Sequence, residues 1–499
     1  MDSLDHNIKV RIRKLEFPSK VNKKGVDVAI ENNVYGFNAS NTFLGALIMN
    51  PFLAALILSL LVFLRPAAAQ EEKPAPQQEE NPVTQWVKDH VKGSFRYKNF
   101  AHFKKTEPEQ RTVRQKGILR LDIEQKFEEN WRLFLSPQWK ADTANYTAGP
   151  WMDFRDTTLR DPYFYLREGH VKYSGGDYDF SVGKQFFSWG TADGYNPTDN
   201  LNPRDFHDVP DREKMGIFSF SASYFPPDSS LSLVIIPLFT PSRLPVIHSR
   251  WIGNANITSP IDPAALGVVV PPGIGIRRRE LPGARLDKIQ VGLRGKTTLS
   301  GWDLSLSYFD GFDTLPVVRV TETVARPRFN RMHVIGMDFS TTTGKLEYHG
   351  EWAWKTYDGG RATDLLPFVI GGMYAWDDDW VKQLGLDEIR LNLEYAGEFT
   401  LHQRDNRQYR ETNLFTRPFQ NSILSRLAFK FDENTEFHVS SNGNFHHHNN
   451  SFLQPKIIHK LSDSIKIEGG LELFWGAQNS FWGKWKRNDR TFVFMTYVF

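Results

Sequence analysis

The stretch Glu-Ile-Arg-Leu-Asn-Leu-Glu-Tyr-Ala-Gly-Glu-Phe-Thr, residues 388–400, alternates apolar with polar side chains. Because successive side chains of a strand point to opposite faces, this segment has one apolar face and one charged face. A charged face cannot point into lipid, but it suits the water-filled side of a membrane barrel whose other side contacts lipid. A soluble β-sandwich also shows alternation, but its strands are usually shorter and bury their apolar face. The segment therefore predicts a transmembrane barrel strand.

The same period of two recurs at residues 119–124, 288–294, 345–356 and 465–473, and weaker candidates fill most of 95–499. We predict an all-β fold, an antiparallel up-and-down transmembrane β-barrel of about 16–18 strands, because bacterial barrels have an even number of strands. The polar faces of these segments give the residues that we expect to face the lumen: Arg120, Lys345, Glu347, Glu351, Arg390 and Glu394.

The connections between these segments alternate in length. Short polar connections at 128–130, 174–177, 341–344, 432–434 and 462–464 are predicted to be periplasmic turns. Long connections at 141–162, 188–214, 239–286, 310–328, 402–420 and 476–490 are predicted to be extracellular loops. Short turns on one side and long loops on the other are typical of outer-membrane barrels.

The last strand reads Thr-Phe-Val-Phe-Met-Thr-Tyr-Val-Phe and ends at Phe499, with Val493, Met495 and Tyr497 at alternate positions before it. Outer-membrane barrels of Gram-negative bacteria end in this way. We interpret Tyr497 and Phe499 as a signal for the barrel-assembly machinery, and we expect the protein in the outer membrane.

The N-terminal part contains an apolar run at 51–64, followed by Ala67, Ala68 and Ala69. A run this short favours a signal peptide over a membrane helix, which needs about 20 residues. We therefore predict a mis-annotated extension at 1–48, a signal peptide at 49–69 whose n-region lacks the usual Lys or Arg, and a disordered periplasmic lead-in at 70–90. A retained anchor is the alternative for 49–69. Residues 91–499 are predicted to form the barrel as one domain.

The composition narrows the chemistry. The chain has no Cys, which excludes disulfides and thiolate metal sites. Its formal net charge of +3 gives no reason to expect nucleic acid as a partner. An aromatic content of 14% with a mean hydropathy of −0.45 suits a barrel with an apolar outside and a polar inside.

The most distinctive loop contains Trp189-Gly190 and two Asn-Pro steps, at Asn196-Pro197 and at Asn202-Pro203-Arg204-Asp205. The pattern resembles a loop in a family of largely uncharacterised, porin-like proteobacterial outer-membrane β-barrels, and more distantly the alginate-export porins. The resemblance is clearest over residues 117–225, and it implies passage of solutes through a pore.

Each proline of this loop fixes its own φ and biases the preceding Asn toward an extended backbone, so the loop should be stiff. A stiff polar loop either constricts the lumen or packs on the rim of the barrel. The residues that would do so are Trp189, Asp193, Asn196, Asp199, Asn202, Arg204 and Asp205.

Other clusters give weaker signals. Arg277, Arg278 and Arg279, with Arg285 nearby, could bind an anionic solute or lipopolysaccharide phosphate, or form a solvated charge run. The tracts at 446–448 (His) and 377–379 (Asp) lack the spacing of a metal site, so we expect neither a metal nor a cofactor. Ser440 lies two residues from His438, but no nucleophile motif accompanies it, and we predict that the protein is not an enzyme.

We predict an outer-membrane channel for passive passage of small solutes, with selectivity set by lumen charges and by the Asn-Pro loop. Its partners would be outer-membrane lipid and lipopolysaccharide, the assembly machinery and a small-molecule solute, and a homo-oligomer is compatible with the sequence. A route for hydrophobic molecules, a non-conducting structural or adhesion barrel, and an outer-membrane enzyme are the alternatives.

Overall fold

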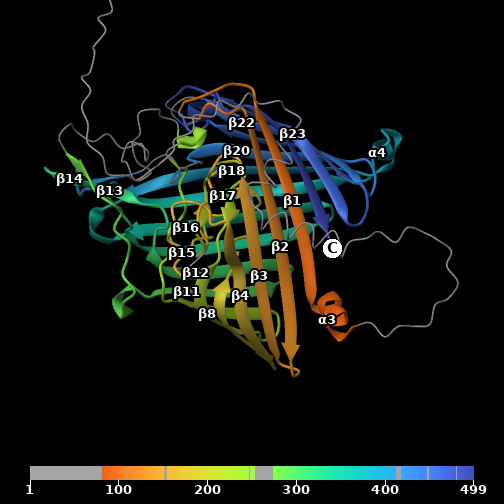
Figure 1. Cartoon of the computed structure of the whole chain (residues 1–499), viewed down its shortest axis with the longest axis horizontal. Coiled ribbons are helices and arrows are strands. Elements are labelled where there is room, and N and C mark those ends of the chain that lie inside the picture. The colour runs from red at the N-terminus through yellow and green to blue at the C-terminus, as the bar shows by residue number, and fades with distance from the viewer. Residues whose placement is uncertain are drawn as a thin grey trace, which may run out of the picture. The chain divides into compact units, whose positions relative to one another are not determined.

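The computed structural model describes residues 81–107, 109–150, 154–246, 248–252, 274–411, 417, 419–446, 449–478 and 480–499 (Figure 1). The extension predicted at 1–48, the signal peptide predicted at 49–69 and most of the lead-in predicted at 70–90 lie outside the described residues.

The fold is an 18-stranded antiparallel barrel in which each strand pairs with the next. The first strand, β1 (Val91–His102), also pairs with the last, β24 (Arg490–Val498), so that Phe95 lies opposite Tyr497 and the sheet closes. The strand count lies within the predicted range. The other barrel strands are β2 (Val113–Phe127), β3 (Trp131–Asp142), β4 (Phe164–Gly175), β5 (Tyr178–Gln185), β8 (Ile217–Tyr224), β9 (Ser229–Ile236), β11 (Gln290–Leu299), β12 (Trp302–Phe312), β15 (Arg331–Thr343), β16 (Leu346–Tyr357), β17 (Asp364–Trp376), β18 (Glu388–His402), β20 (Asn421–Lys430), β21 (Thr435–Asn444), β22 (Asn450–Lys460) and β23 (Ile465–Trp475).

Short elements occupy the connections. A two-stranded sheet pairs β6 (Arg204–Asp205) with β7 (Glu213–Lys214), and a four-stranded sheet joins β10 (Gly275–Ile276), β14 (Val324–Arg328), β13 (Val317–Val320) and β19 (Tyr409–Arg410). The helices are α3 (Pro82–His90), α4 (Asp379–Gln383) and the 3-10 turns η1 (Arg250–Ile252), η2 (Leu286–Lys288), η3 (Asp358–Gly360) and η4 (Gly483–Trp485).

Burial in the wall is the inverse of that in a soluble protein. On β18, Leu393 is 50% exposed and Tyr395 is 42% exposed, whereas Glu394 between them is 2% exposed. The outer surface carries many more large apolar side chains, among them Leu306, Ile335, Trp354, Ile370, Ile457 and Val493. Such a continuous apolar outer surface is unfavourable in water and is what lipid requires. The barrel is therefore membrane-spanning. Among the described residues, no helix is both long and apolar enough to cross a bilayer.

The connections follow the predicted alternation of length. Those at one end of the barrel are short: 128–130, 176–177, 225–228, 300–301, 344–345, 377–387, 431–434 and 461–464. Those at the other end include all six predicted long loops, and the full set is 103–112, 143–163, 186–216, 237–289, 313–330, 358–363, 403–420, 445–449 and 476–489. Two of the latter, 358–363 and 445–449, are short, and 377–387 on the turn side carries helix α4.

The expectation of a disordered lead-in up to residue 90 is wrong for Pro82–His90, which form α3. Asn81 caps the helix by accepting from the Val83 amide at 3.0 Å, and proline occupies its first turn, where a missing N–H costs nothing. Trp86 stacks on His90 and donates from Nε1 to Gln125 Oε1 on β2 at 2.9 Å. These local contacts order a segment whose composition alone predicts disorder.

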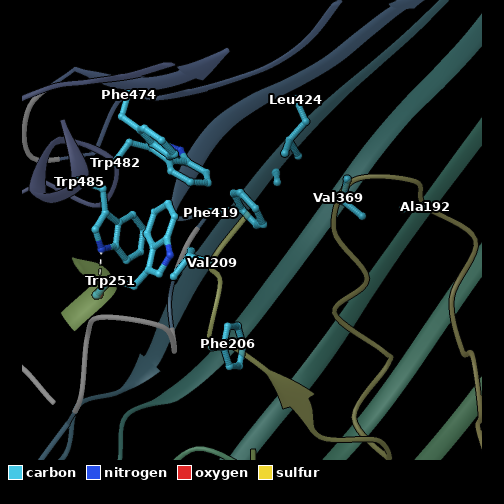
Figure 2. Close-up of a cluster of buried hydrophobic side chains, with 11 residues drawn as sticks. Ala192, Phe206, Val209, Trp251, Val369, Phe419, Leu424, Phe474, Trp482 and Trp485 are labelled. Carbon is cyan, nitrogen blue, oxygen red and sulfur yellow. Dashed lines mark hydrogen bonds between the residues drawn. The ribbon is translucent and has the colours of Figure 1, made fainter. Parts of the chain in front are cut away.

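The interior of the barrel contains an apolar cluster, which we call the lumen aromatic cluster (Figure 2). It comprises Ala192, Phe206, Val209, Trp251, Val369, Ala396, Phe419, Leu424, Phe474, Trp482 and Trp485. Trp485 Nε1 donates to the Trp251 carbonyl at 3.0 Å, and Trp482 Nε1 donates to Asn442 Oδ1 at 2.9 Å. Because its members come from four long connections and from the inward faces of four strands, those connections fold into the barrel and pack there.

Candidate lumen site

Residues 186–216, between β5 and β8, form what we call the inner segment, which contains every loop residue singled out from the sequence. It first contacts β16, where Glu351 accepts from Asn196 Nδ2 at 3.0 Å and from Thr198 Oγ1 at 2.5 Å. The Ala192 amide donates to the same carboxylate at 3.4 Å. Glu351 therefore holds the first Asn-Pro step of the inner segment against the wall.

The inner segment next contacts β18 and β20. Glu394 accepts from the backbone amides of Asp193 and Gly194 at 2.7 and 3.0 Å, and its Oε1 lies 3.0 Å from His349 Nε2. The Asp193 side chain accepts in turn from Arg426 at 2.6 Å. Glu351 and Glu394 are both buried, and both bind the inner segment.

The second half of the inner segment is held on the opposite strands. Asp208 accepts two hydrogen bonds from Arg490 of β24, both at 2.7 Å, and one from Arg114 of β2 at 2.9 Å. Arg490 also contacts Glu472 of β23, and Asp211 accepts from Lys98 of β1 at 2.6 Å. The inner segment therefore has polar anchors on β16, β18 and β20 and again on β1, β2 and β24.

Two buried carboxyl groups in this second half, those of Asp208 and Asp205, have lowered pKa values. Burial alone would raise the pKa of Asp208, but Arg490 and Arg114 hold it well below its usual range. Burial acts in the same direction on Asp205, whose pKa His207 and Arg243 together hold far below normal. Both carboxylates are therefore charged at neutral pH and bind their cations in that form.

The remaining predicted loop residues have structural roles within the inner segment. Asn202 accepts from the Phe187 amide at 2.7 Å and donates to the Met215 carbonyl at 2.8 Å, which ties the two ends of the inner segment together. Asp199 pairs with Arg204 at 3.1 Å, and Asp205 pairs with Arg243 at 3.2 Å. Trp189 is buried in an apolar cluster against Leu201, Ile217 and the inner faces of β9, β12, β15 and β16.

The other predicted lumen residues pair with side chains outside the inner segment. Arg120 pairs with Asp122 at 3.2 Å, and Glu347 lies 3.8 Å from His349 Nδ1. Arg390 pairs with Glu388. Lys345 lies in the turn before β16 and pairs with Asp377 and Asp378 of the 377–387 connection. At the terminal strand, the Phe499 amide donates to the Gly93 carbonyl at 2.9 Å, and the Tyr497 and Phe499 rings stack at 5.6 Å.

Sequence reasoning missed Asp208, which anchors the second half of the inner segment. It also missed the wall residues joined at that point, namely Arg490, Arg114 and Glu472. A second buried network was missed as well, in which Arg243 pairs with Asp156 and Asp161 of the 143–163 connection and with Asp205 of the inner segment. The signal for Arg490, Arg114 and Glu472 was their position on the inward parity of their strands. No local signal marks Arg243, since its partners come from elsewhere in the chain.

Two cavities adjoin the inner segment. The first, which we call the mouth cavity, has a volume of about 270 Å³ and is lined by Lys355, Tyr357 and Glu398 near the long-loop ends of β16 and β18. The second, the deep cavity, has a volume of about 230 Å³ and is lined by Asn392 and Glu394, nearer the turn end of β18. Both cavities share a lining of Asp193, Gly194, Val209, Arg212 and Phe419. The two cavities are therefore neighbours that adjoin at these five residues.

The weaker sequence signals do not converge on a site. Arg277, Arg278 and Arg279 line an open hollow with Arg326 and Glu280 at the β14 sheet. His447 and His448 lie outside the described residues, and Asp379 begins α4. Within the described part of the chain, no group of His, Asp and Glu has the arrangement of a metal site.

No protein-family model matches the chain. No curated protein matches it either. Among solved structures, the chain is similar to a triple mutant of the Rhodopseudomonas blastica porin, at 11% identity and a TM-score of 0.36, covering 82% of this chain and 99% of that chain. It is also similar to a loop-deletion form of OmpT, an outer membrane protein of Vibrio cholerae, at 9% identity and a TM-score of 0.37, covering 82% of this chain and 98% of that one. TM-scores this low do not establish a shared fold, so we assign the barrel from the pairing of its strands alone. The resemblance to alginate-export porins stays a prediction.

Proposed function

We propose that the protein is a porin-like channel of the Gram-negative outer membrane, through which small solutes pass passively beside the inner segment. The proposal rests on one observation: the mouth cavity and the deep cavity meet at a shared lining of five residues within a polar lumen. Because the inner segment is anchored on opposite walls, it narrows this route rather than leaving the lumen open. In this proposal the constriction comprises Asp193 and the residues around it.

The absence of Cys from the chain allows a clean test. Ser440 lines the deep cavity, opposite Arg426 in the strand register, whereas Ile423 on β20 faces outward and is 42% exposed. We expect stable single-channel steps in planar bilayers, which fall when a charged methanethiosulfonate reagent modifies Ser440→Cys. The same reagent should leave the conductance of Ile423→Cys unchanged.

Each outcome separates the alternatives. Steps that fall only for Ser440→Cys support a route through the deep cavity. Steps that are insensitive to modification would place the route elsewhere. A folded barrel without any conductance would overturn the channel proposal.

A non-conducting structural barrel is the second candidate, and the lumen aromatic cluster favours it. Trp251, Trp482 and Trp485 are nearly fully buried inside the barrel and fill part of its cross-section (Figure 2). If this cluster extends the blockage of the inner segment across the whole lumen, no ion current will be measured even after removal of the inner-segment contacts.

The terminal strand supports the proposed location. The Gly93 amide donates to the Phe499 carbonyl at 2.7 Å, and the Phe499 ring fills the space that a side chain at residue 93 would need, 2.1 Å from an ideal Cβ. Phe499 is thus part of the seam between β1 and β24, where closure of the barrel takes place. Deletion of Phe499 should reduce the amount of folded protein recovered from outer-membrane fractions.

A further inference from the structure

Two charged residues of the inner segment, Asp193 and Arg212, line both cavities, and Arg212 is the basic one. Its sequence neighbours point the other way, since Asp211 lies 2.6 Å from Lys98 and Glu213 lies 3.5 Å from Lys140, both on the barrel wall. Arg212 itself lines both cavities, at the residues that they share.

The acids around the two cavities are already committed to other groups. Asp193 pairs with Arg426, Asp199 pairs with Arg204 and Lys214, and Glu398 pairs with Arg417. Asp313 accepts from the Leu315 amide and the Tyr357 hydroxyl. Among the described residues, none of these carboxylates bonds to Arg212.

The electrostatics of Arg212 agree with this geometry. Burial, together with the neighbouring positive charge of Arg204, lowers the pKa of Arg212 to about 10 against an opposing effect of Tyr195. Among the described residues, no carboxylate adds to that opposing effect. A desolvated guanidinium without an acidic partner gains most from an anion that enters the cavity, because charge-assisted bonds to Arg are strong and directional.

Apolar and aromatic side chains lie beside Arg212 in a lining that is otherwise largely polar. Val209 and Phe419 are shared by both cavities, Tyr195 lies in the mouth cavity with its ring 5.0 Å from Phe419, and Phe452 and Trp482 line the deep cavity. Figure 2 shows Val209, Phe419 and Trp482 within the lumen aromatic cluster. A ligand at the lining that the two cavities share meets the Arg212 guanidinium beside Val209 and the Phe419 ring.

We infer that Arg212 and these rings form a binding site for a small carboxylate with an apolar body, of which benzoate is the simplest probe. The inference deepens the proposed function, because it assigns the solute class to the same route. The carboxylate accepts from the Arg212 guanidinium, and the apolar body contacts Phe419 and its neighbours. Each cavity has room for a ligand of this size but not for a large one.

The test is calorimetric titration of the full chain, purified in detergent, with benzoate, benzamide and acetate after subtraction of micelle blanks. We expect saturable binding of benzoate, with benzamide and acetate each at least tenfold weaker. Arg212→Gln should weaken the binding of benzoate by about ten- to a hundredfold, which is the range for a lost hydrogen bond to a charged group. Arg212→Lys keeps the charge without the planar guanidinium, so its affinity for benzoate should lie between those of the parent and of Arg212→Gln.

The matched control is Arg285→Gln, which removes the same charge from an exposed connection where Arg285 pairs with Asp287. It should bind benzoate as the parent does, and each variant is checked for heat-modifiable mobility as evidence of a folded barrel. Absence of saturable benzoate binding by the parent, or equal loss in the control, would overturn the site.

Conductance separates the site from the channel proposal. Benzoate binding by a barrel that conducts nothing would keep the site and overturn the channel. Conductance by a barrel whose benzoate binding is absent or does not depend on Arg212 would keep the channel proposal and overturn the site.

Discussion

The anchor at Asp208 gives the sharpest test of how the inner segment is held. In the parent, the Asp208 carboxylate accepts three hydrogen bonds from Arg490 and Arg114, and both guanidiniums are almost fully buried. Asp208→Asn removes the charge and keeps the shape. We expect it to destabilise the folded barrel and to free the second half of the inner segment.

The magnitude follows from what each guanidinium retains. Removal of one partner from a buried ion pair costs about 3–5 kcal/mol when the other charge is left alone. Here Arg490 keeps Glu472 and Arg114 keeps Asp142, so neither cation becomes isolated. We therefore expect the low end of that range, about 3 kcal/mol in the free energy of unfolding.

The effect of Asp208→Asn also has a defined pH dependence. A carboxyl whose folded-state pKa is lowered stabilises the fold above its unfolded-state pKa, about 3.9 for Asp, and loses that effect as the pH falls toward the folded-state pKa. The pKa of Asp208 is lowered by its guanidinium partners against the effect of burial. The difference between parent and variant should thus be full at pH 7 and should shrink below about pH 5.

The assay is urea unfolding in lipid vesicles, followed by tryptophan fluorescence, at pH 7 and at pH 4. The control is Asp377→Asn, because Asp377 pairs with Lys345 in an exposed turn, where ion pairs contribute little. A shift for Asp208→Asn no larger than that of the control, or one that grows toward acid pH, would refute the reasoning.

Three further predictions concern the same region. Glu394→Ala removes the acceptor of two backbone amides of the inner segment, so single-channel steps in planar bilayers should become larger and noisier, and unchanged steps would contradict its role as an anchor. Gly190→Ala should lower stability by about 1–3 kcal/mol in urea unfolding, because Gly190 has φ +97° and an ideal Cβ would lie 2.3 Å from Glu351 Oε2; an unchanged midpoint would argue against strain there. Trp482→Ala should lower the free energy of unfolding by about 3 kcal/mol, because it leaves a void in the lumen aromatic cluster, and urea unfolding should detect this loss. An unchanged unfolding midpoint would mean that the cluster is loosely packed.

The architecture was predictable because the bilayer imposes a two-residue period. Leu393, Glu394 and Tyr395 alternate in sequence as they do in exposure, and a lipid-facing wall permits no other arrangement. Helix α3 was not predictable in this way, because its order depends on a hydrogen bond from Trp86 to Gln125, which lies on strand β2. Composition reports what a segment can bury by itself, and it cannot report a partner supplied by the tertiary fold.

The site was predictable only in part, for the same reason. Asn-Pro steps marked the inner segment, and inward parity marked Glu351 and Glu394, because both signals are local. The contacts that join them link residues more than 150 positions apart in the chain, such as Thr198 with Glu351. The Arg243 network likewise draws on three connections that come together only inside the barrel.

The distribution of paired and unpaired charges bears directly on selectivity. The chain has a formal net charge of only +3, which would suggest a weakly selective lumen. Most charges beside the cavities are neutralised by a neighbour, however, and a neutralised pair exerts little field on a passing solute. Among the described residues, Arg212 has no acidic partner, and it lines both cavities. We therefore predict that selectivity depends on this residue more than on the sum of lumen charges. Arg212→Gln should lower anion over cation selectivity, and Arg285→Gln should leave it unchanged.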